Sequence, residues 1–235
     1  MTILRSVTLC SLLAFSCLGL APMAQAAAPA DWAGLAHYQA ANTALGPPAV
    51  DEARVVFMGD SITEFWDKAP SALFSNKSYV NRGISGQTTP QMLVRFRADV
   101  LELRPRAVVI LAGTNDIAGN TGPSSVDTIA GHLLSMAQLA QAQGIKVVLC
   151  ALVPAATYYW NPEIRPAAAI EALNQRIRTL AVARGYGFVD YYGAMVGEGG
   201  ALKPALSGDG VHPNEAGYRV MTPLVEQAVK AALQP

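Results

Sequence analysis

An acidic residue and a histidine near the C-terminus could act together in acid–base chemistry. Asp209 stands three residues before His212, so a single turn of chain can bring its carboxylate to one nitrogen of the imidazole ring. That contact fixes the tautomer of the ring, and the other nitrogen can then accept a proton. His37 and His132 have no comparable neighbour and are interpreted as surface or packed residues. The sequence therefore offers one general base with an orienting acid.

A serine that such a base could activate follows an apolar run earlier in the chain. Ser61 lies in the segment Gly59-Asp60-Ser61-Ile62-Thr63, where we predict a strand-to-helix turn. Such a turn exposes the hydroxyl as a nucleophile, and the helix N-terminus stabilises developing negative charge. Capping of the helix by Asp60 or Ser61 is the alternative interpretation. Because position 63 is threonine, the Gly-x-Ser-x-Gly elbow of α/β-hydrolases is absent.

Two other loops contain groups that could bind an oxyanion. Gly83 and Gly86 permit a tight turn and close approach of a backbone N–H to a ligand, although a turn alone explains them. Asn115 offers a side-chain amide donor, and an Asx-turn explains it equally well in isolation. Together with the serine, the base and its acid, these donors complete the set of groups that acyl transfer requires.

Aromatic residues mark two places where a substrate could be recognised. Trp66 is one candidate, and the other is the run Tyr158, Tyr159 and Trp160 in the loop 155–166. Adjacent rings could stack on a sugar or line an acyl pocket. Packing of the rings onto the domain is an equally good explanation. Prolines in and beside this loop predict a stiff segment rather than a mobile lid.

The elements that must position these residues follow from the hydrophobic pattern. Short β-branched runs alternate with longer stretches of helical periodicity, which is typical of βαβ units and a parallel sheet. We predict strands at residues 54–58, 79–81, 107–111, 146–152 and 187–189, and helices at 90–103, 126–143, 164–184 and 214–233. In one doubly wound domain, the loops that follow the strands emerge at one edge. The candidate residues should therefore meet there.

Composition excludes two classes of function. The 235 residues contain 17 Lys and Arg against 17 Asp and Glu, with no basic cluster, so neither nucleic acid nor a membrane surface is an expected partner. The chain is 51% hydrophobic and 14% charged, and part of this apolarity belongs to its N-terminal segment. The buried position expected for Cys150, in an apolar run, argues against a nucleophilic thiol.

Residues 1–26 have the order of a secretory signal peptide. Arg5 is their only charge, an apolar run follows at 7–20, and small residues end the segment at Ala26. The run is shorter than the roughly 20 residues of a membrane-spanning helix. We predict cleavage after Ala26 and an exported protein, periplasmic or secreted. An uncleaved anchor and a lipoprotein signal ending at Cys17 are the alternatives.

In chain order, four segments resemble motif blocks of the SGNH hydrolases, also called the GDSL esterase and lipase family: Gly59-Asp60-Ser61, Gly83-Ile84-Ser85-Gly86, Gly113-Thr114-Asn115-Asp116 and Asp209-Gly210-Val211-His212. Ile62 replaces the usual leucine of the first block and carries no reacting atom. The resemblance implies a single doubly wound, flavodoxin-like, three-layer α/β domain at 27–235, with about five parallel strands and the first strand between the second and third.

The resemblance also implies an activity and its residues. Ser61, Asp209 and His212 would be catalytic, with Ser61, Gly86 and Asn115 forming the oxyanion hole and with neither a metal nor an organic cofactor. The expected function is hydrolysis of small-molecule or glycan esters with short or carbohydrate-linked acyl groups. The alternatives are a lysophospholipase or thioesterase acting on longer chains, and a non-catalytic carbohydrate-binding module. The sequence predicts no oligomeric state.

Overall fold

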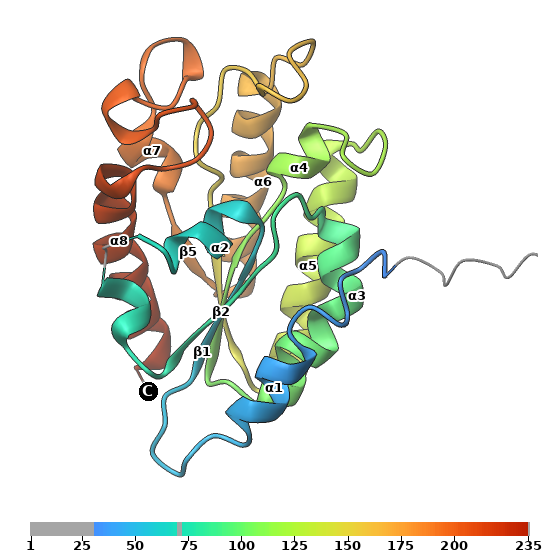
Figure 1. Ribbon diagram of the computed structural model, residues 1–235, viewed down its shortest axis with the longest axis vertical. Coiled ribbons are helices and arrows are strands. Elements are labelled where there is room, and N and C mark those ends of the chain that lie inside the picture. The colour runs from blue at the N-terminus through green and yellow to red at the C-terminus, as the bar shows by residue number, and fades with distance from the viewer. Residues whose placement is uncertain (1–30, 70–71, 235) are drawn as a thin grey trace, which may run out of the picture. The chain divides into compact units, whose positions relative to one another are not determined.

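A parallel β-sheet forms the centre of the computed structural model, which describes residues 31–69 and 72–234 (Figure 1). Its strands lie in the order β2-β1-β3-β4-β5. Their bounds are β1 (Val55–Gly59), β2 (Tyr79–Gly83), β3 (Ala107–Leu111), β4 (Lys146–Cys150) and β5 (Gly187–Val189). All the neighbouring pairs are parallel. The predicted doubly wound α/β sheet, with its first strand between the second and third, is confirmed.

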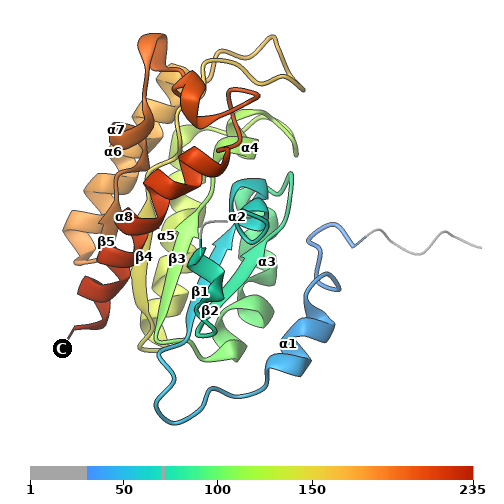
Figure 2. The ribbon, with the colours of Figure 1, turned by 60° about the vertical axis from the view of Figure 1, so that its left-hand side comes forward.

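Helices cover both faces of this sheet (Figure 2). They are α1 (Gln39–Leu45), α2 (Ser61–Trp66), α3 (Thr89–Asp99), α4 (Thr114–Ile117), α5 (Val126–Ala142), α6 (Ala167–Arg184), α7 (Tyr191–Met195) and α8 (Glu215–Leu233). One core cluster joins the sheet to α3, α5 and α6, and a second joins it to α2, α7 and α8. No helix in the described part of the chain is long and apolar enough to cross a membrane.

The strand sequences explain these two cores. β1 and β3 are buried along their whole length, and successive side chains of a strand point to opposite faces. Val56 and Met58 therefore belong to the first core, whereas Val55 and Phe57 belong to the second. Strands covered on both faces are continuously apolar, which is the pattern that predicted them.

The ends of two elements differ clearly from the predictions. β4 ends at Cys150 rather than at residue 152, because the N–H of Leu152 donates to the side chain of Asn174 at 2.7 Å. α6 begins at Ala167 rather than at 164, with Pro166 at its N-cap position. The short helices α1, α4 and α7 were not predicted. The predicted signal peptide at 1–26 lies outside the described residues.

Candidate active site

Ser61 and His212 meet at the carboxyl edge of the sheet. Ser61 is the first residue of α2, directly after β1, and the side chain of Asp60 caps this helix by accepting from the Ile62 N–H at 3.0 Å. Ser61 Oγ lies 3.0 Å from His212 Nε2. On the other side of the ring, His212 Nδ1 lies 2.7 Å from Asp209 Oδ2. The three side chains thus form one continuous hydrogen-bonded chain.

The turn that contains Asp209 holds this carboxylate in place. The backbone N–H groups of Val211 and His212 donate to Asp209 Oδ1 at 2.9 and 2.7 Å. Partial burial alone would raise the pKa of Asp209, but hydrogen bonds from the His212 ring and from these N–H groups lower it below its ordinary value. Asp209 is therefore held as a carboxylate beside the imidazole, which fixes the proton of the ring on Nδ1.

The predicted oxyanion donors lie beside the serine. Gly86 adopts a φ of +76°, in the left-handed region that favours glycine. At Gly83 an added Cβ would lie 2.2 Å from the backbone nitrogen of Glu64, so this loop packs directly against α2. The carboxylate of Glu64 also accepts from the Ser85 N–H at 2.8 Å. Asn115 lies in α4, after β3, and is 4% exposed.

These groups line one small pocket of about 230 Å³. Its walls are formed by Ser61, Phe65, Ser85, Gly86, Asn115, Asn120, Tyr159, Trp160 and His212. The ring centroids of Phe65, Tyr159 and Trp160 lie 5.4, 6.2 and 6.5 Å from that of His212. Every predicted catalytic and oxyanion residue except Asp209, which lies behind His212, is in this lining.

Two of the four predicted substrate contacts are not on the pocket wall. Trp66 is 2% exposed and its ring stacks on that of Tyr218 in the core, with centroids 5.3 Å apart. Tyr158 is fully buried beneath Trp160, at a centroid distance of 4.8 Å. Burial of these two rings corrects the prediction that they contact substrate. Tyr159 and Trp160 do lie on the wall.

Sequence reasoning assigned no site role to three residues of the pocket, namely Ser85, Phe65 and Asn120. Phe65 stands four residues after Ser61, a spacing that places both on one face of α2, so helical periodicity could have found it. Asn120 lies in the loop after α4, and its amide contacts Asn115, Gly86 and Trp160. Nothing in the spacing of these residues signals such a cluster.

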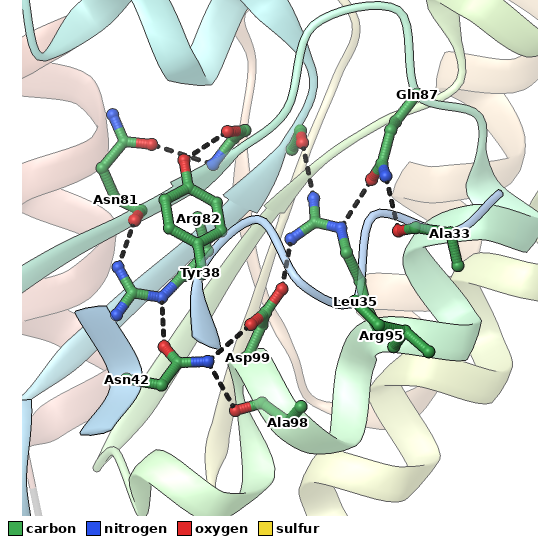
Figure 3. A network of polar contacts seen from close by, with 12 residues as sticks. Ala33, Leu35, Tyr38, Asn42, Asn81, Arg82, Gln87, Arg95, Ala98 and Asp99 are labelled. Atoms are coloured by element: carbon green, nitrogen blue, oxygen red, sulfur yellow. Dashed lines mark hydrogen bonds and ion pairs between the residues drawn. The ribbon is translucent and has the colours of Figure 1, made fainter. Parts of the chain in front are cut away.

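A buried network supports the loops from below (Figure 3). Arg95 is fully buried in α3 and pairs with Asp99 at 2.9 Å. Its guanidinium also donates to the carbonyl of Gly59, at 3.1 Å, and to the side chain of Gln87, at 2.5 Å. Gly59 precedes Asp60 and Ser61, and Gln87 follows Gly86. One side chain therefore holds both the turn that contains Ser61 and the loop that contains Gly86.

The N-terminal part of the described chain joins the same network (Figure 3). Asn42 of α1 donates to Asp99 at 2.7 Å and accepts from Arg82 at 2.8 Å. The side chain of Gln87 donates to the carbonyl of Ala33 at 2.7 Å. These bonds hold residues 31–46 against β2 and α3.

A second anchor fixes the start of α3. Asp116 accepts hydrogen bonds from the N–H and the hydroxyl of Thr89, at 2.9 and 2.5 Å. Burial raises the pKa of Asp116 above its ordinary value. The contacts hold the loop between β2 and α3, which contains Gly86, against α4.

Comparisons with known proteins agree with this geometry. The model of the GDSL-like lipase/acylhydrolase family matches residues 57–220. A crystal structure of a GDSL-like lipase from Bacteroides thetaiotaomicron has a TM-score of 0.84 and 48% sequence identity, covering 86% of this chain and 100% of that one.

Two curated esterases also match. Esterase TesA of Pseudomonas aeruginosa is 32% identical over 134 residues, which are 57% of this chain and 60% of TesA. An acetylxylan esterase of Xylanibacter ruminicola is 26% identical over 227 residues, covering 78% of this chain and 44% of that protein. This chain thus spans less than two thirds of the length of either curated relative. The family model matches most of the chain, and the four motif segments meet at one edge of the sheet. The chain therefore belongs to the GDSL-like lipase/acylhydrolase family.

Proposed function

We propose that this protein is an exported serine esterase that removes short acyl groups, including acyl groups linked to carbohydrate, through a covalent acyl-enzyme. The observation that carries the proposal is the hydrogen-bonded chain from Ser61 Oγ through His212 to Asp209, which opens into a small pocket. A hydroxyl, an imidazole and a carboxylate in this order are the groups of a serine hydrolase.

Each group has a defined role at each step of the proposed reaction. Ser61 Oγ attacks the ester carbonyl carbon while His212 Nε2 takes the hydroxyl proton, and Asp209 stabilises the imidazolium. The oxyanion accepts hydrogen bonds from the backbone N–H groups of Ser61 and Gly86 and from Asn115 Nδ2. His212 then protonates the leaving alcohol. Water, activated by His212, attacks the acyl-enzyme, and the carboxylic acid and the free serine are released.

The size of the pocket supports a short acyl group. Its volume of about 230 Å³ is below the range of roughly 300–1,000 Å³ in which drug-sized ligands bind. The small residues Ser85 and Gly86 form one wall. A long alkyl chain would extend out of this space into solvent and gain little from burial.

The exposed aromatic rings support a ring-shaped alcohol as the leaving group. Tyr159 is 63% exposed, and Phe65 and Trp160 are each 36% exposed, so part of each ring surface is open to solvent beside His212. Aromatic faces stack on the apolar faces of sugars. The acetylxylan esterase among the relatives favours the same class of substrate.

Hydrolysis of a series of esters tests this proposal. We expect nitrophenyl acetate and butyrate to be cleaved with a higher kcat/KM than nitrophenyl esters of long chains, and acetylated xylo-oligosaccharides to lose acetate. Ser61→Ala should abolish both reactions and leave the fold intact. A long-chain optimum would instead identify a lysophospholipase or thioesterase, and binding of glycans without hydrolysis would identify a binding module.

Export rests on the N-terminal pattern of one positive charge, an apolar run and a small-residue end at Ala26. Expression of the whole chain in a bacterial host, followed by N-terminal sequencing of the extracytoplasmic product, tests it. The sequence should begin at Ala27. A product that begins at Met1 and stays in the cytoplasm contradicts the proposal.

A further inference from the structure

Asn120 uses every polar atom of its side chain to connect the walls of the pocket. Asn120 Nδ2 donates to Asn115 Oδ1 at 3.0 Å and to the carbonyl of Gly86 at 3.1 Å. Asn120 Oδ1 accepts from the indole Nε1 of Trp160, also at 3.1 Å. One exposed amide thus joins two predicted oxyanion donors to the aromatic wall.

The hydrogen bond from Asn120 to Asn115 bears on which atom of the Asn115 amide can bind an oxyanion. An asparagine can present either its oxygen or its nitrogen, and only the nitrogen donates. Because Asn120 Nδ2 donates to Asn115 Oδ1, the oxygen of Asn115 is directed toward Asn120 and its nitrogen faces other acceptors. That nitrogen donates to the carbonyl of Gln87 at 3.0 Å and has a long contact of 3.4 Å with Asp60 Oδ2. The contact with Asp60 is the longer and weaker of the two, and it is the one that a bond to an oxyanion would replace.

We propose that Asn120 is a positioning residue that fixes the amide of Asn115 with its nitrogen toward the reacting carbonyl, and that couples this amide to Trp160. The inference rests on the proposed esterase function, since it acts through the oxyanion hole. Asn120 does not itself stabilise the charge. Its effect falls on kcat, because a misdirected Asn115 loses a bond that forms only in the transition state.

The bond from Trp160 gives the arrangement a further property. A leaving group that stacks on the indole ring lies on the same side chain whose N–H orients Asn120. A leaving group bound at Trp160 therefore restrains, through Asn120, the amide of Asn115 that binds the oxyanion. Trp160→Phe removes the indole N–H and keeps an aromatic ring, so it should separate the effect of this hydrogen bond from the effect of stacking.

Steady-state kinetics on nitrophenyl acetate test the proposal. Asn120→Ala removes the hydrogen-bond donor to Asn115 Oδ1 and keeps Asn115 itself. We expect kcat to fall about 10-fold with KM changed less than about twofold. Asn120→Asp replaces the donor with a carboxylate oxygen that repels Asn115 Oδ1, so kcat should fall at least about 100-fold, within the range of about 10² to 10³ expected for Asn115→Ala. Trp160→Phe should lower kcat about threefold with KM unchanged.

A double-mutant cycle distinguishes positioning from a general structural role. If Asn120 acts through Asn115, Asn120→Ala has no further effect on kcat in the Asn115→Ala background. Equally, Trp160→Phe has no further effect in the Asn120→Ala background. Ser124→Ala, an exposed position in the same loop, is the matched control and should retain the kcat and Tm of the parent.

Three kinetic results would overturn the inference: multiplicative losses in the cycle, a change confined to KM, or an unchanged kcat in Asn120→Asp. Failure of the esterase proposal is recognised separately, because hydrolysis would then persist in Ser61→Ala. A fall in Tm of Asn120→Ala that accounts for the lost activity would also overturn it. Circular dichroism melts of each variant supply that measurement.

Discussion

Asn115 is the residue whose amide chemistry carries the most weight in the proposed mechanism. It is buried at 4% exposure and lines the pocket beside Ser61. Asn115→Ala should lower kcat by about 10² to 10³, because removing one oxyanion donor costs that much in other hydrolases. KM should change little in steady-state assays on a short-chain ester. A rise in KM with kcat unchanged would show instead that Asn115 only binds substrate.

Asp60 predicts a dependence of stability on pH. Its side chain is fully buried, and this burial raises the pKa of Asp60 from 3.8 to about 6. An acid whose pKa is higher in the folded state binds more protons when folded, so stability is lost as the pH rises from about 4 to about 6. The change in the pKa of Asp60 from 3.8 to about 6 corresponds to roughly 3 kcal/mol of stability.

Asp60→Asn removes this titration while keeping an oxygen that can accept from the Ile62 N–H. Urea unfolding at pH 4 and pH 7 should show a smaller loss of stability between these values in the variant than in the parent, by about 3 kcal/mol. Asp67→Asn, at an exposed position of the same segment, should retain the parent profile. Identical profiles for Asp60→Asn and the parent would contradict the prediction.

Single residues also show where sequence reasoning reaches its limit. The serine, the base and its acid were predicted because their motifs are local and ordered along the chain. Trp66 and Phe65 are adjacent, yet one is buried in the core and the other lines the pocket. Successive residues of a helix point about 100° apart, so of these two only Phe65, four residues after Ser61, shares the face of the serine. The prediction rested on the aromatic type of Trp66 and did not use this spacing.

At the scale of elements, the buried ion pair of Arg95 and Asp99 in α3 should contribute more to stability than any single contact of the loops above it. Arg95→Met would leave the carboxylate of Asp99 buried without its charged partner. Breaking a buried ion pair in this way costs about 3–5 kcal/mol, and urea unfolding should show that loss. Arg97→Met, at an exposed position of the same helix, is the matched control. Equal stability of the two variants would contradict this role of Arg95.

Sequence reasoning predicted which elements exist better than where they end. β3 was found with its exact bounds because its run is continuously apolar and covered on both faces. β4 was extended too far, since the side chain of Asn174 comes from a helix that is remote in sequence. The network of Arg95, Asn42 and Arg82 was not foreseen. Its partners come from four separate segments, and no periodicity connects them.

For the whole molecule, Cys150 offers a probe of global unfolding. It is buried at the end of β4, and this burial raises its pKa to about 12. The folded protein that begins at Ala27 should therefore resist alkylation by iodoacetamide, because the thiolate is the reactive species. Labelling should proceed at the rate of global opening and accelerate with urea in parallel with unfolding. Rapid labelling under native conditions would contradict this burial.

The hydrogen bond between Ser61 and His212 joins residues 151 positions apart. Ser61 follows the first strand, while His212 comes after the last one. The contact is supported by Tyr218 of α8, whose hydroxyl donates to the carbonyl of Ile62 in α2 at 2.8 Å. Contacts of such long range are slow to form, because closing a long loop costs entropy. In a refolding chain, ester hydrolysis should therefore begin only when the C-terminal segment that contains His212 has docked. The start of hydrolysis then reports that this segment has folded.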